Sequence, residues 1–293
     1  MQRIAITGAS GLIGSALVGK LKGDGYTVQR LVRRPTVSAE EIFWNPATQE
    51  IDLAALEGVD AVIHLAGAGV GDKRWTKKYK SEILNSRLLG TTTIANAVAQ
   101  VKPKVFISSS AIGWYGETGN RAVTEIDRGG DDFLAAVCRE WEAAADLAGD
   151  VRTVKIRTGL VLDPTGGALG RMLPLFRFGL GGKLGSGKQW WSWITLHDHL
   201  RAIEFILEND QISGPVNVTS PNPVTNQEFT SALARALRRP ALFPAPAFAL
   251  KLALGGFSTE ILGSKKVLPN ALTEAGFNFE FPHIGPALDA LAD

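Results

Sequence analysis

The sequence predicts an α/β protein, with a doubly wound parallel sheet and a smaller mixed C-terminal domain. Short apolar runs rich in branched residues alternate with helix-period segments through the first half of the chain. Such alternation is typical of a parallel sheet covered by helices on both faces. A glycine-rich turn follows the first apolar run, and the texture changes after Gly159. We expect strands over residues 3–7, 27–32, 61–65, 105–109 and 151–157, and helices over 12–21, 81–101 and 131–147.

The second half of the chain is richer in loops. Residues 163–193 form a glycine-rich segment that contains tryptophans. A helix is expected to begin near Asp198, and a strand is expected over residues 216–219. Thr225 and Glu228 match a capping box, in which each side chain accepts a hydrogen bond from the other residue's backbone N–H at a helix start. We therefore expect a small mixed domain in this half.

Composition indicates an ordinary globular protein. The 293 residues are 45% hydrophobic and 20% charged, with a formal net charge of +2. The single Cys138 cannot form a disulfide within the chain, which excludes a disulfide framework and favours the reducing cytoplasm. The first residues lead directly into an apolar strand, so no secretion leader is expected. This overall balance gives no case for a nucleic-acid or membrane partner, and we expect neither.

The turn after the first strand carries the strongest functional signal. Its three glycines, Gly8, Gly11 and Gly14, have the spacing of a dinucleotide-binding fingerprint between a strand and a helix. They permit the tight turn, the approach of backbone to a pyrophosphate and the close packing of helix on strand. The N–H groups of Leu12 and Ile13, at the start of the helix, would face the anion.

The end of the second strand bears on the choice between the two nicotinamide cofactors. Arg33 lies 19 residues after Gly14, within Leu31–Pro35, and no acid follows until Glu40. A carboxylate there would bind the ribose of NAD(H), whereas a guanidinium can bind the 2′-phosphate of NADP(H). NADP(H) is therefore the expected cofactor. The alternative is that these arginines only end a strand in solvent.

These signals divide the chain into two parts. We expect an NADP-binding domain over residues 1–160 and a mainly substrate-binding domain over 161–293. The helix over 198–208 is expected to pack back on the first domain.

Further motifs reveal a family resemblance. They are His64–Gly67 at the end of the third expected strand, Ser108–Ser110 leading to Tyr115–Gly116, and Trp193–Asp198 before a helix. Together with the glycine-rich turn, they resemble the short-chain dehydrogenase/reductase superfamily in its extended, nucleotide-sugar-epimerase-like form, which has a Rossmann fold. The resemblance covers nearly the whole chain.

A narrower branch is suggested by Trp75, by Gly181–Gly182 and by Pro223–Phe229. It is the branch labelled an epimerase family or cell-division-inhibitor-like. No residue here gives the second label physical support.

The resemblance implies roles for further residues. Ser110 matches the catalytic serine that binds a substrate oxygen, and its alternative is a strand-end serine bonded to backbone. The remaining positions match cofactor contacts on the adenosine side, on the following helix and beside the nicotinamide: Leu65, Ala66, Gly67, Glu82, Arg87 and Val161. For Glu82 and Arg87 the alternative is a solvated helix face.

The chemistry of the superfamily needs a Tyr followed four residues later by a Lys, whose charge lowers the pKa of the phenol. The corresponding segment here offers Phe133 with Val137, or Leu134 with Cys138. Neither pair can exchange a proton beside a fixed cation. We name no general base, although Tyr115, Glu125, Asp127 and His197 are candidates for a replacement acid.

The leading hypothesis is an NADP(H)-dependent oxidoreductase or epimerase-like enzyme that acts on a small carbonyl or hydroxyl substrate, such as a sugar nucleotide. The alternative is a non-catalytic NADP(H)-binding or sensing module. The resemblance is compatible with a homodimer, because extended members often pair through two long helices. His197–His199 lacks further ligands at metal-site spacing, so no metal is expected. The basic run Lys73–Lys80 is expected to lie near an anionic ligand, and Trp190–Trp193 near the substrate. The alternative is that one or two of these tryptophans belong to the core.

Overall fold

The chain folds into two lobes, and the first lobe is built on a sheet of eight strands. Their order is β12-β8-β6-β5-β1-β2-β3-β4. The structure is a computed structural model that describes residues 2–292. All neighbouring strands of the sheet are parallel except β3 and β4. Their bounds are β1 Arg3–Thr7, β2 Thr27–Val32, β3 Glu41–Asn45, β4 Glu50–Ile51, β5 Ala61–His64, β6 Val105–Ala111, β8 Thr153–Thr158 and β12 Gly214–Val218. The expected doubly wound α/β fold is confirmed.

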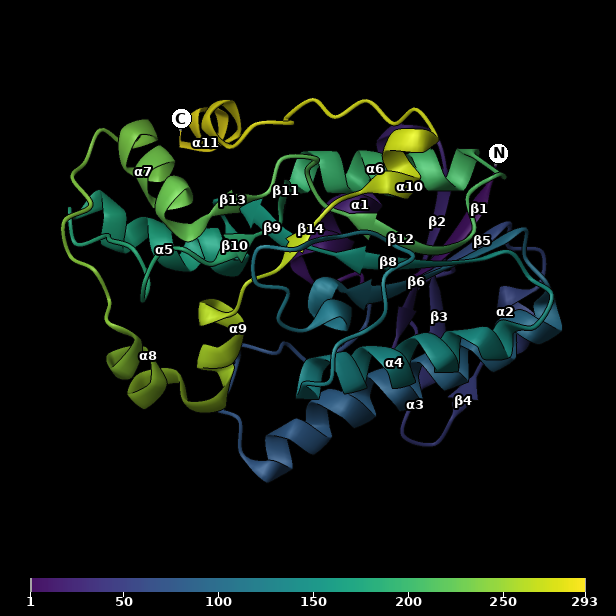
Figure 1. The fold of residues 1–293 in the computed structure, drawn as a ribbon. Coiled ribbons are helices and arrows are strands. Elements are labelled where there is room, and N and C mark those ends of the chain that lie inside the picture. The colour runs from purple at the N-terminus through teal and green to yellow at the C-terminus, as the bar shows by residue number, and fades with distance from the viewer. Residues whose placement is uncertain (1, 293) are drawn as a thin grey trace.

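Helices cover both faces of this sheet (Figure 1). One face carries α1 (Leu12–Gly23), α6 (Leu196–Glu208) and α10 (Asn270–Glu274), and the other carries α3 (Lys77–Val101) and α4 (Phe133–Ala145). The short α2 (Leu53–Leu56) and the 3-10 turns η1 (Ile112–Tyr115) and η2 (Asp146–Ala148) complete the lobe.

The two faces bury different residues because successive side chains of a strand point to opposite sides. Ile4 and Ile6 of β1 pack in one core with Leu17 of α1 and Ile203 of α6. Ala5, between them, packs in the other core with residues of α3. The helix α6 therefore rests on the first lobe, although it follows the loop-rich segment in the chain.

The second lobe is built on small strand pairs. Trp193 and Phe229 lie fully buried in its core. Its strands are β9 Leu160–Asp163 with β11 Trp193–Thr195, β10 Trp190–Trp191 with β13 Val224–Thr225, and β7 Ala122–Val123 with β14 Lys266–Val267. Its helices are α5 Gly167–Arg177, α7 Asn226–Ala236, α8 Ala247–Leu254, η3 Gly255–Phe257, α9 Ser258–Leu262 and α11 Ile284–Ala292. The expected capping box is confirmed at the start of α7.

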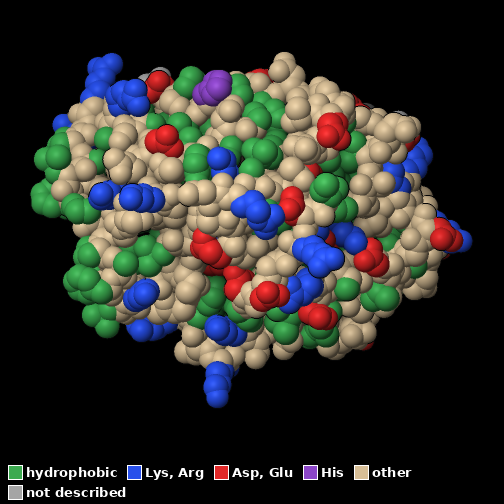
Figure 2. Space-filling model, in the orientation of Figure 1, with side chains coloured by type: hydrophobic (Ala, Val, Ile, Leu, Met, Phe, Trp, Pro, Cys, Tyr) green, Lys and Arg blue, Asp and Glu red, His purple; other side chains and the backbone are tan. Residues whose placement is uncertain are grey.

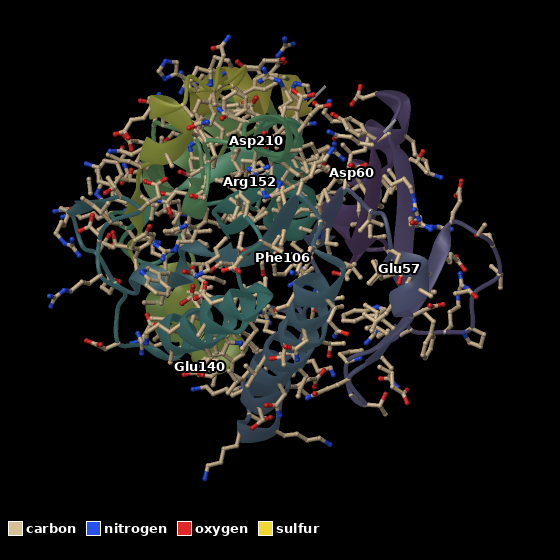
Figure 3. The ribbon with its side chains drawn as sticks, turned by 90° about the vertical axis from the view of Figure 1, so that its right-hand side faces the viewer. Glu57, Asp60, Phe106, Glu140, Arg152 and Asp210 are labelled. Atoms are coloured by element: carbon tan, nitrogen blue, oxygen red, sulfur yellow. The ribbon has the colours of Figure 1, made fainter. Side chains whose placement is uncertain are left out.

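The C-terminal end of α6 is held by Arg152 (Figure 3). Its Nη1 donates to the carbonyl oxygens of Ile206, Asn209 and Ile212 at 3.0–3.2 Å, and its Nη2 lies 3.4 Å from Asp210 Oδ1. One guanidinium thus satisfies carbonyl groups that a helix end leaves without partners.

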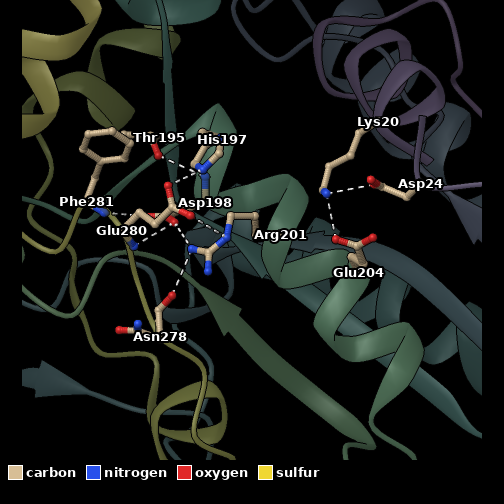
Figure 4. A network of polar contacts seen from close by, with 10 residues as sticks. All are labelled: Lys20, Asp24, Thr195, His197, Asp198, Arg201, Glu204, Asn278, Glu280 and Phe281. Atoms are coloured by element: carbon tan, nitrogen blue, oxygen red, sulfur yellow. Dashed lines mark hydrogen bonds and ion pairs between the residues drawn. The ribbon is translucent and has the colours of Figure 1, made fainter. Parts of the chain in front are cut away.

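The buried carboxylate of Asp198, in the first turn of α6, holds the segment that leads to α11 (Figure 4). It accepts hydrogen bonds from Glu280 N at 3.1 Å, Phe281 N at 2.8 Å and Arg201 Nη1 at 2.8 Å. The two histidines that flank Asp198 have separate partners: His197 pairs with Glu280, and His199 bonds to Thr158. Across residues 2–292, His, Cys, Asp and Glu side chains form no group of three that could hold a metal ion. Within the same residues, no helix has the length and apolar character needed to span a bilayer.

Candidate cofactor site

The glycine-rich turn has a geometry that only glycine can adopt at two of its positions. Gly8 has φ +67°, and a Cβ there would lie 2.8 Å from the carbonyl carbon of Leu65. A Cβ on Gly14 would lie 2.1 Å from Gly8 O. Gly11 donates its N–H to Gly8 O at 3.0 Å and is the N-cap of α1, without a side-chain cap. Leu12 and Ile13 open the helix, so their N–H groups point out of its positive end. The turn is a backbone cradle of the kind that binds a pyrophosphate.

Thr7 joins this turn to the end of β5. Its Oγ1 accepts from Leu65 N at 3.0 Å and Ala66 N at 3.3 Å, and lies 2.8 Å from His64 Nδ1. Complete burial lowers the pKa of His64 to about 3, so this imidazole is neutral at physiological pH. The Leu65–Gly67 backbone, expected to pass the adenosine, is thus fixed beside Gly8.

The two arginines at the end of β2 differ in their partners. Arg34 donates to both oxygens of Glu41, at 2.6 and 2.9 Å, and Arg30 also donates to Glu41 at 3.1 Å. Arg33 is exposed and makes no hydrogen bond or ion pair with the residues that the structure describes. Arg33 is therefore the guanidinium available to an anion at this strand end.

Arg87 lies against the backbone that follows β5. Its Nη1 donates to Ala68 O at 2.9 Å and Ile83 O at 3.1 Å, and its guanidinium stacks over Trp141 at 4.8 Å. A Cβ on Gly67 would lie 3.5 Å from Arg87 Cζ. No carboxylate pairs with Arg87 among the described residues, and burial lowers the pKa of its guanidinium. The side chain brings a positive charge to the space between α3 and α4.

Glu82, expected like Arg87 to face the bound dinucleotide, lies on the exposed side of α3. Its carboxylate is 3.5 Å from Lys73 Nζ, and both side chains are about half exposed or more. Its contact with the cofactor stays a prediction.

Ser110 is buried against α4. It is 3% exposed, and its Oγ donates to Glu142 Oε1 at 2.6 Å. Arg157 binds both oxygens of the same carboxylate, at 2.8 and 2.9 Å. Sequence reasoning missed Glu142, although an acid on the apolar side of an amphipathic helix is itself a signal for a buried pair.

Tyr115, a candidate replacement acid, belongs to the same network. Arg157 Nη1 donates to its hydroxyl at 3.0 Å, and the hydroxyl donates to Asn217 Oδ1 at 2.7 Å. Burial raises the pKa of Tyr115 to about 12. This phenol is committed to holding β12 and η1 together.

The position where the superfamily places its tyrosine is apolar and lined by rings. Phe133 begins α4, and its ring lies 5.3 Å from that of Trp75, which in turn lies 5.9 Å from Phe257. Lys80 Nζ stands 4.7 Å from the centre of the Phe133 ring. Cys138, one turn after Leu134, donates its thiol to Ala111 O, and burial raises the pKa of this thiol to about 12. No proton donor on α4 replaces the tyrosine at this position.

The second lobe approaches the turn through α5 and β9. Val161 pairs with Ile194 between β9 and β11, and Leu12 packs against Gly166 at the start of α5. A bridging segment, residues 68–76, runs from the end of β5 to this lobe. It is held by Arg171 Nη1 donating to Gly71 O at 2.9 Å and by Arg74 Nη1 donating to Leu252 O at 3.1 Å. Val161 and the start of α5 thus lie close to the glycine-rich turn, where the two lobes meet.

Two family models and several known proteins match this chain. Residues 4–133 match the model of the NAD dependent epimerase/dehydratase family, and residues 245–291 match a domain of unknown function, DUF1731. An epimerase family protein of Mycobacterium leprae is 45% identical over 97% of this chain and 94% of its own. A chloroplastic epimerase family protein of Arabidopsis thaliana is 39% identical over 98% of this chain and 86% of its own.

A solved structure extends the likeness to three dimensions. The crystal structure of human epimerase family protein SDR39U1 (isoform 2) with NADPH superposes with a TM-score of 0.92, at 33% identity over 99% of both chains. The structure of MoeE5 with UDP-glucose and NAD shares the fold, with a TM-score of 0.78 at 21% identity.

Proposed function

Since the chain belongs to the epimerase family of NAD dependent epimerases and dehydratases, we propose that it is an NADP(H)-dependent oxidoreductase or epimerase-like enzyme that works without a tyrosine–lysine pair. Its substrate is a small carbonyl or hydroxyl compound. The cofactor, when bound, supplies or accepts a hydride. The observation that carries the proposal is the glycine cradle at Gly8–Gly14 combined with the unpaired Arg33.

The cradle fits a dinucleotide because Gly8 and Gly14 let the turn pack tightly between the end of β5 and the start of α1. The backbone N–H groups of Leu12 and Ile13, at the start of the helix, would bind the pyrophosphate. Thr7 fixes Leu65 and Ala66 where they contact the adenosine. Arg33 binds the 2′-phosphate, which a human relative's NADPH also carries.

Arg87 supplies the positive charge that a lysine supplies in the superfamily, because Val137 stands at the lysine position of this chain. Its guanidinium lies beside Gly67 and over Trp141, the residue one helical turn after Val137. Burial raises the pKa of the nearby Cys138 thiol to about 12, and the charge of Arg87 opposes this shift only in part. Because no carboxylate neutralises Arg87 among the described residues, its charge is available to the ribose and nicotinamide side of the cofactor.

Phe133 cannot exchange a proton, so any proton transfer in this enzyme uses a group outside the usual tyrosine position. Lys80 is the cation that stands over the Phe133 ring. Ser110 as a substrate contact stays a prediction, since its hydroxyl is donated to Glu142 in this structure.

A second candidate, a non-catalytic NADP(H)-binding or sensing module, is favoured by one observation: Phe133 and Val137 remove both members of the proton-transfer pair. The two functions share the cofactor site and differ only in hydride transfer.

The deciding experiment follows the hydride. The full chain is loaded with NADPH deuterated at the reactive carbon and incubated with an extract of cytoplasmic metabolites. We expect protein-dependent deuterium in one small hydroxyl compound, detected by mass spectrometry. Because an epimerase returns its hydride internally, isomer ratios are measured in the same extract. Tight NADPH binding with neither label transfer nor isomer change would overturn the enzyme proposal in favour of sensing.

A further inference from the structure

One edge of the second lobe exposes an unusual amount of apolar surface. Ten large hydrophobic side chains are exposed among the described residues, and seven of them lie on this edge. Figure 2 shows green side chains gathered at the left, over α5 and α8. We call this set the apolar edge: Leu175, Phe178, Leu180, Leu242, Phe243, Phe248 and Leu252.

The segments of the apolar edge lie side by side. Leu180 forms a bridge with Ala241, and Phe243 N donates to Gly181 O at 3.1 Å. Phe248 and Leu252 are four residues apart, so they share one face of α8. Both are 74% exposed, and α8 has no buried residue. An eight-residue helix this apolar and this exposed lacks the packing partner that normally stabilises it.

The chain segments that carry the apolar edge hold charges of one sign. Residues 164–197 and 229–259 together contain eight Lys or Arg and no Asp or Glu. Six exposed cations of these segments make no ion pair with the described residues: Arg177, Lys188, Arg235, Arg238, Arg239 and Lys251. The net charge of +2 is a sum over the whole chain, so it does not reveal this local excess of positive charge. For that reason the net charge alone indicated no membrane partner.

This combination selects one occupant. A second copy docking through the same face would bring like charges together, which opposes association. Apolar side chains projecting from loops and a short helix, ringed by Lys and Arg, match the interface of an anionic bilayer. There the apolar tips enter the head-group boundary, and the cations contact lipid phosphates and carboxylates.

We propose that the apolar edge docks the protein reversibly on a membrane surface rich in anionic lipid. Docking uses exposed residues that contribute nothing to the cofactor cradle, so it does not depend on the proposed hydride chemistry. It places α8 and the loop over residues 240–246 at the lipid head groups.

The test is flotation of the full chain with vesicles. One set contains phosphatidylcholine alone, and the other contains added phosphatidylserine. We expect binding to the anionic vesicles that weakens as salt increases, with little binding to the neutral ones. The double variant Phe248→Ser/Leu252→Ser should lose about tenfold or more of its affinity, and so should Arg238→Gln/Arg239→Gln.

The matched control is Val37→Ser/Ile126→Ser, which removes equally exposed apolar side chains elsewhere, at 78% and 94% exposure. It should bind vesicles like the wild type. Circular dichroism and NADPH affinity confirm that each variant is folded. The proposal is overturned if wild type ignores anionic vesicles, or if the apolar-edge variants bind as well as wild type. It is also overturned if sedimentation velocity shows a wild-type dimer that only these variants abolish, because the edge would then serve a second copy.

Discussion

Glu41 pairs with Arg34 and not with the adjacent Arg33. Its carboxylate oxygens accept from Arg34 Nη1 at 2.9 Å and Nη2 at 2.6 Å. This pairing lowers the pKa of Glu41, so the carboxylate stays charged at neutral pH. Arg33, one residue earlier, keeps all its donors free for a ligand. A sequence with two neighbouring arginines thus contains one structural and one available guanidinium.

Arg33→Ala should weaken NADPH binding by about 10- to 100-fold, because a charge-assisted contact contributes about 1.5–3 kcal/mol. NADH, which lacks the 2′-phosphate, should bind as before. Fluorescence titration with both cofactors measures the effect. Arg34→Ala is the control, with a smaller loss of NADPH affinity. An unchanged NADPH affinity in Arg33→Ala would disprove the phosphate contact.

Gly14→Ala should destabilise the protein by about 1–3 kcal/mol and abolish tight NADPH binding, because its Cβ would meet Gly8 O at 2.1 Å. Gly19 lies in the same helix with nothing within 4 Å of a Cβ. Gly19→Ala should therefore raise the free energy of unfolding by about 0.5–1 kcal/mol and leave binding intact. Urea unfolding and cofactor titration of both variants check the pair. Equal behaviour of the two alanines would refute a steric cradle.

Arg87→Met should weaken NADPH binding by about tenfold while the unfolding free energy of the cofactor-free protein changes by less than about 1 kcal/mol. The methionine loses two carbonyl contacts but also removes a partly buried charge without an acidic partner. Arg87→Lys should recover part of the affinity. A large loss of stability with normal NADPH affinity would make Arg87 a structural residue instead.

Stability should fall as pH is lowered from 6.5. Burial lowers the pKa of His64 to about 3 and of His199 to about 4, from 6.5. The unfolded chain then binds protons that the folded chain does not, so each histidine's contribution is complete above pH 6.5 and is lost toward its folded pKa. At pH 5 each of the two histidines lowers the free energy of unfolding by about 2 kcal/mol relative to neutral pH. Urea unfolding of His64→Gln at several pH values should show a pH dependence smaller by about one proton than that of wild type. An unchanged pH dependence would contradict a neutral buried imidazole at this position.

Ser110→Ala should lower the free energy of unfolding by about 1 kcal/mol, because the buried Glu142 loses a donor. NADPH affinity should be unchanged. The deuterium-transfer assay on this variant decides the catalytic assignment of Ser110: normal transfer would withdraw it, and loss of transfer beyond the loss of folded protein would support it.

Local patterns made most of the fold predictable. The strand over residues 27–32 and the ends of α1, α3 and α6 lie within a few residues of expectation, because each element has a clear period or cap. The family resemblance is confirmed as well. It could be recognised from sequence because the glycine-rich turn is a contiguous motif that needs no knowledge of distant contacts. The strands β3 and β4 were not predicted, because β3 has only three apolar residues between polar ends and β4 has only two residues.

The network around Ser110 could not be predicted. Its partners Glu142 and Arg157 follow it by 32 and 47 residues, and nothing local indicates that their side chains meet. Lys80 over Phe133 is a similar case, because the pairing depends on how α3 lies against α4. The sequence was therefore enough to locate the glycine-rich turn. The charged contacts around Ser110 and Phe133, in contrast, can be seen only once the fold is known.

The bridging segment over residues 68–76 has a kinetic consequence. Arg171 and Arg74 fasten it to α5 and α8, and Trp75 packs on Phe257. Separating the two lobes at this segment would break both hydrogen bonds and this ring contact at once, so relative motion of the lobes should be slow here.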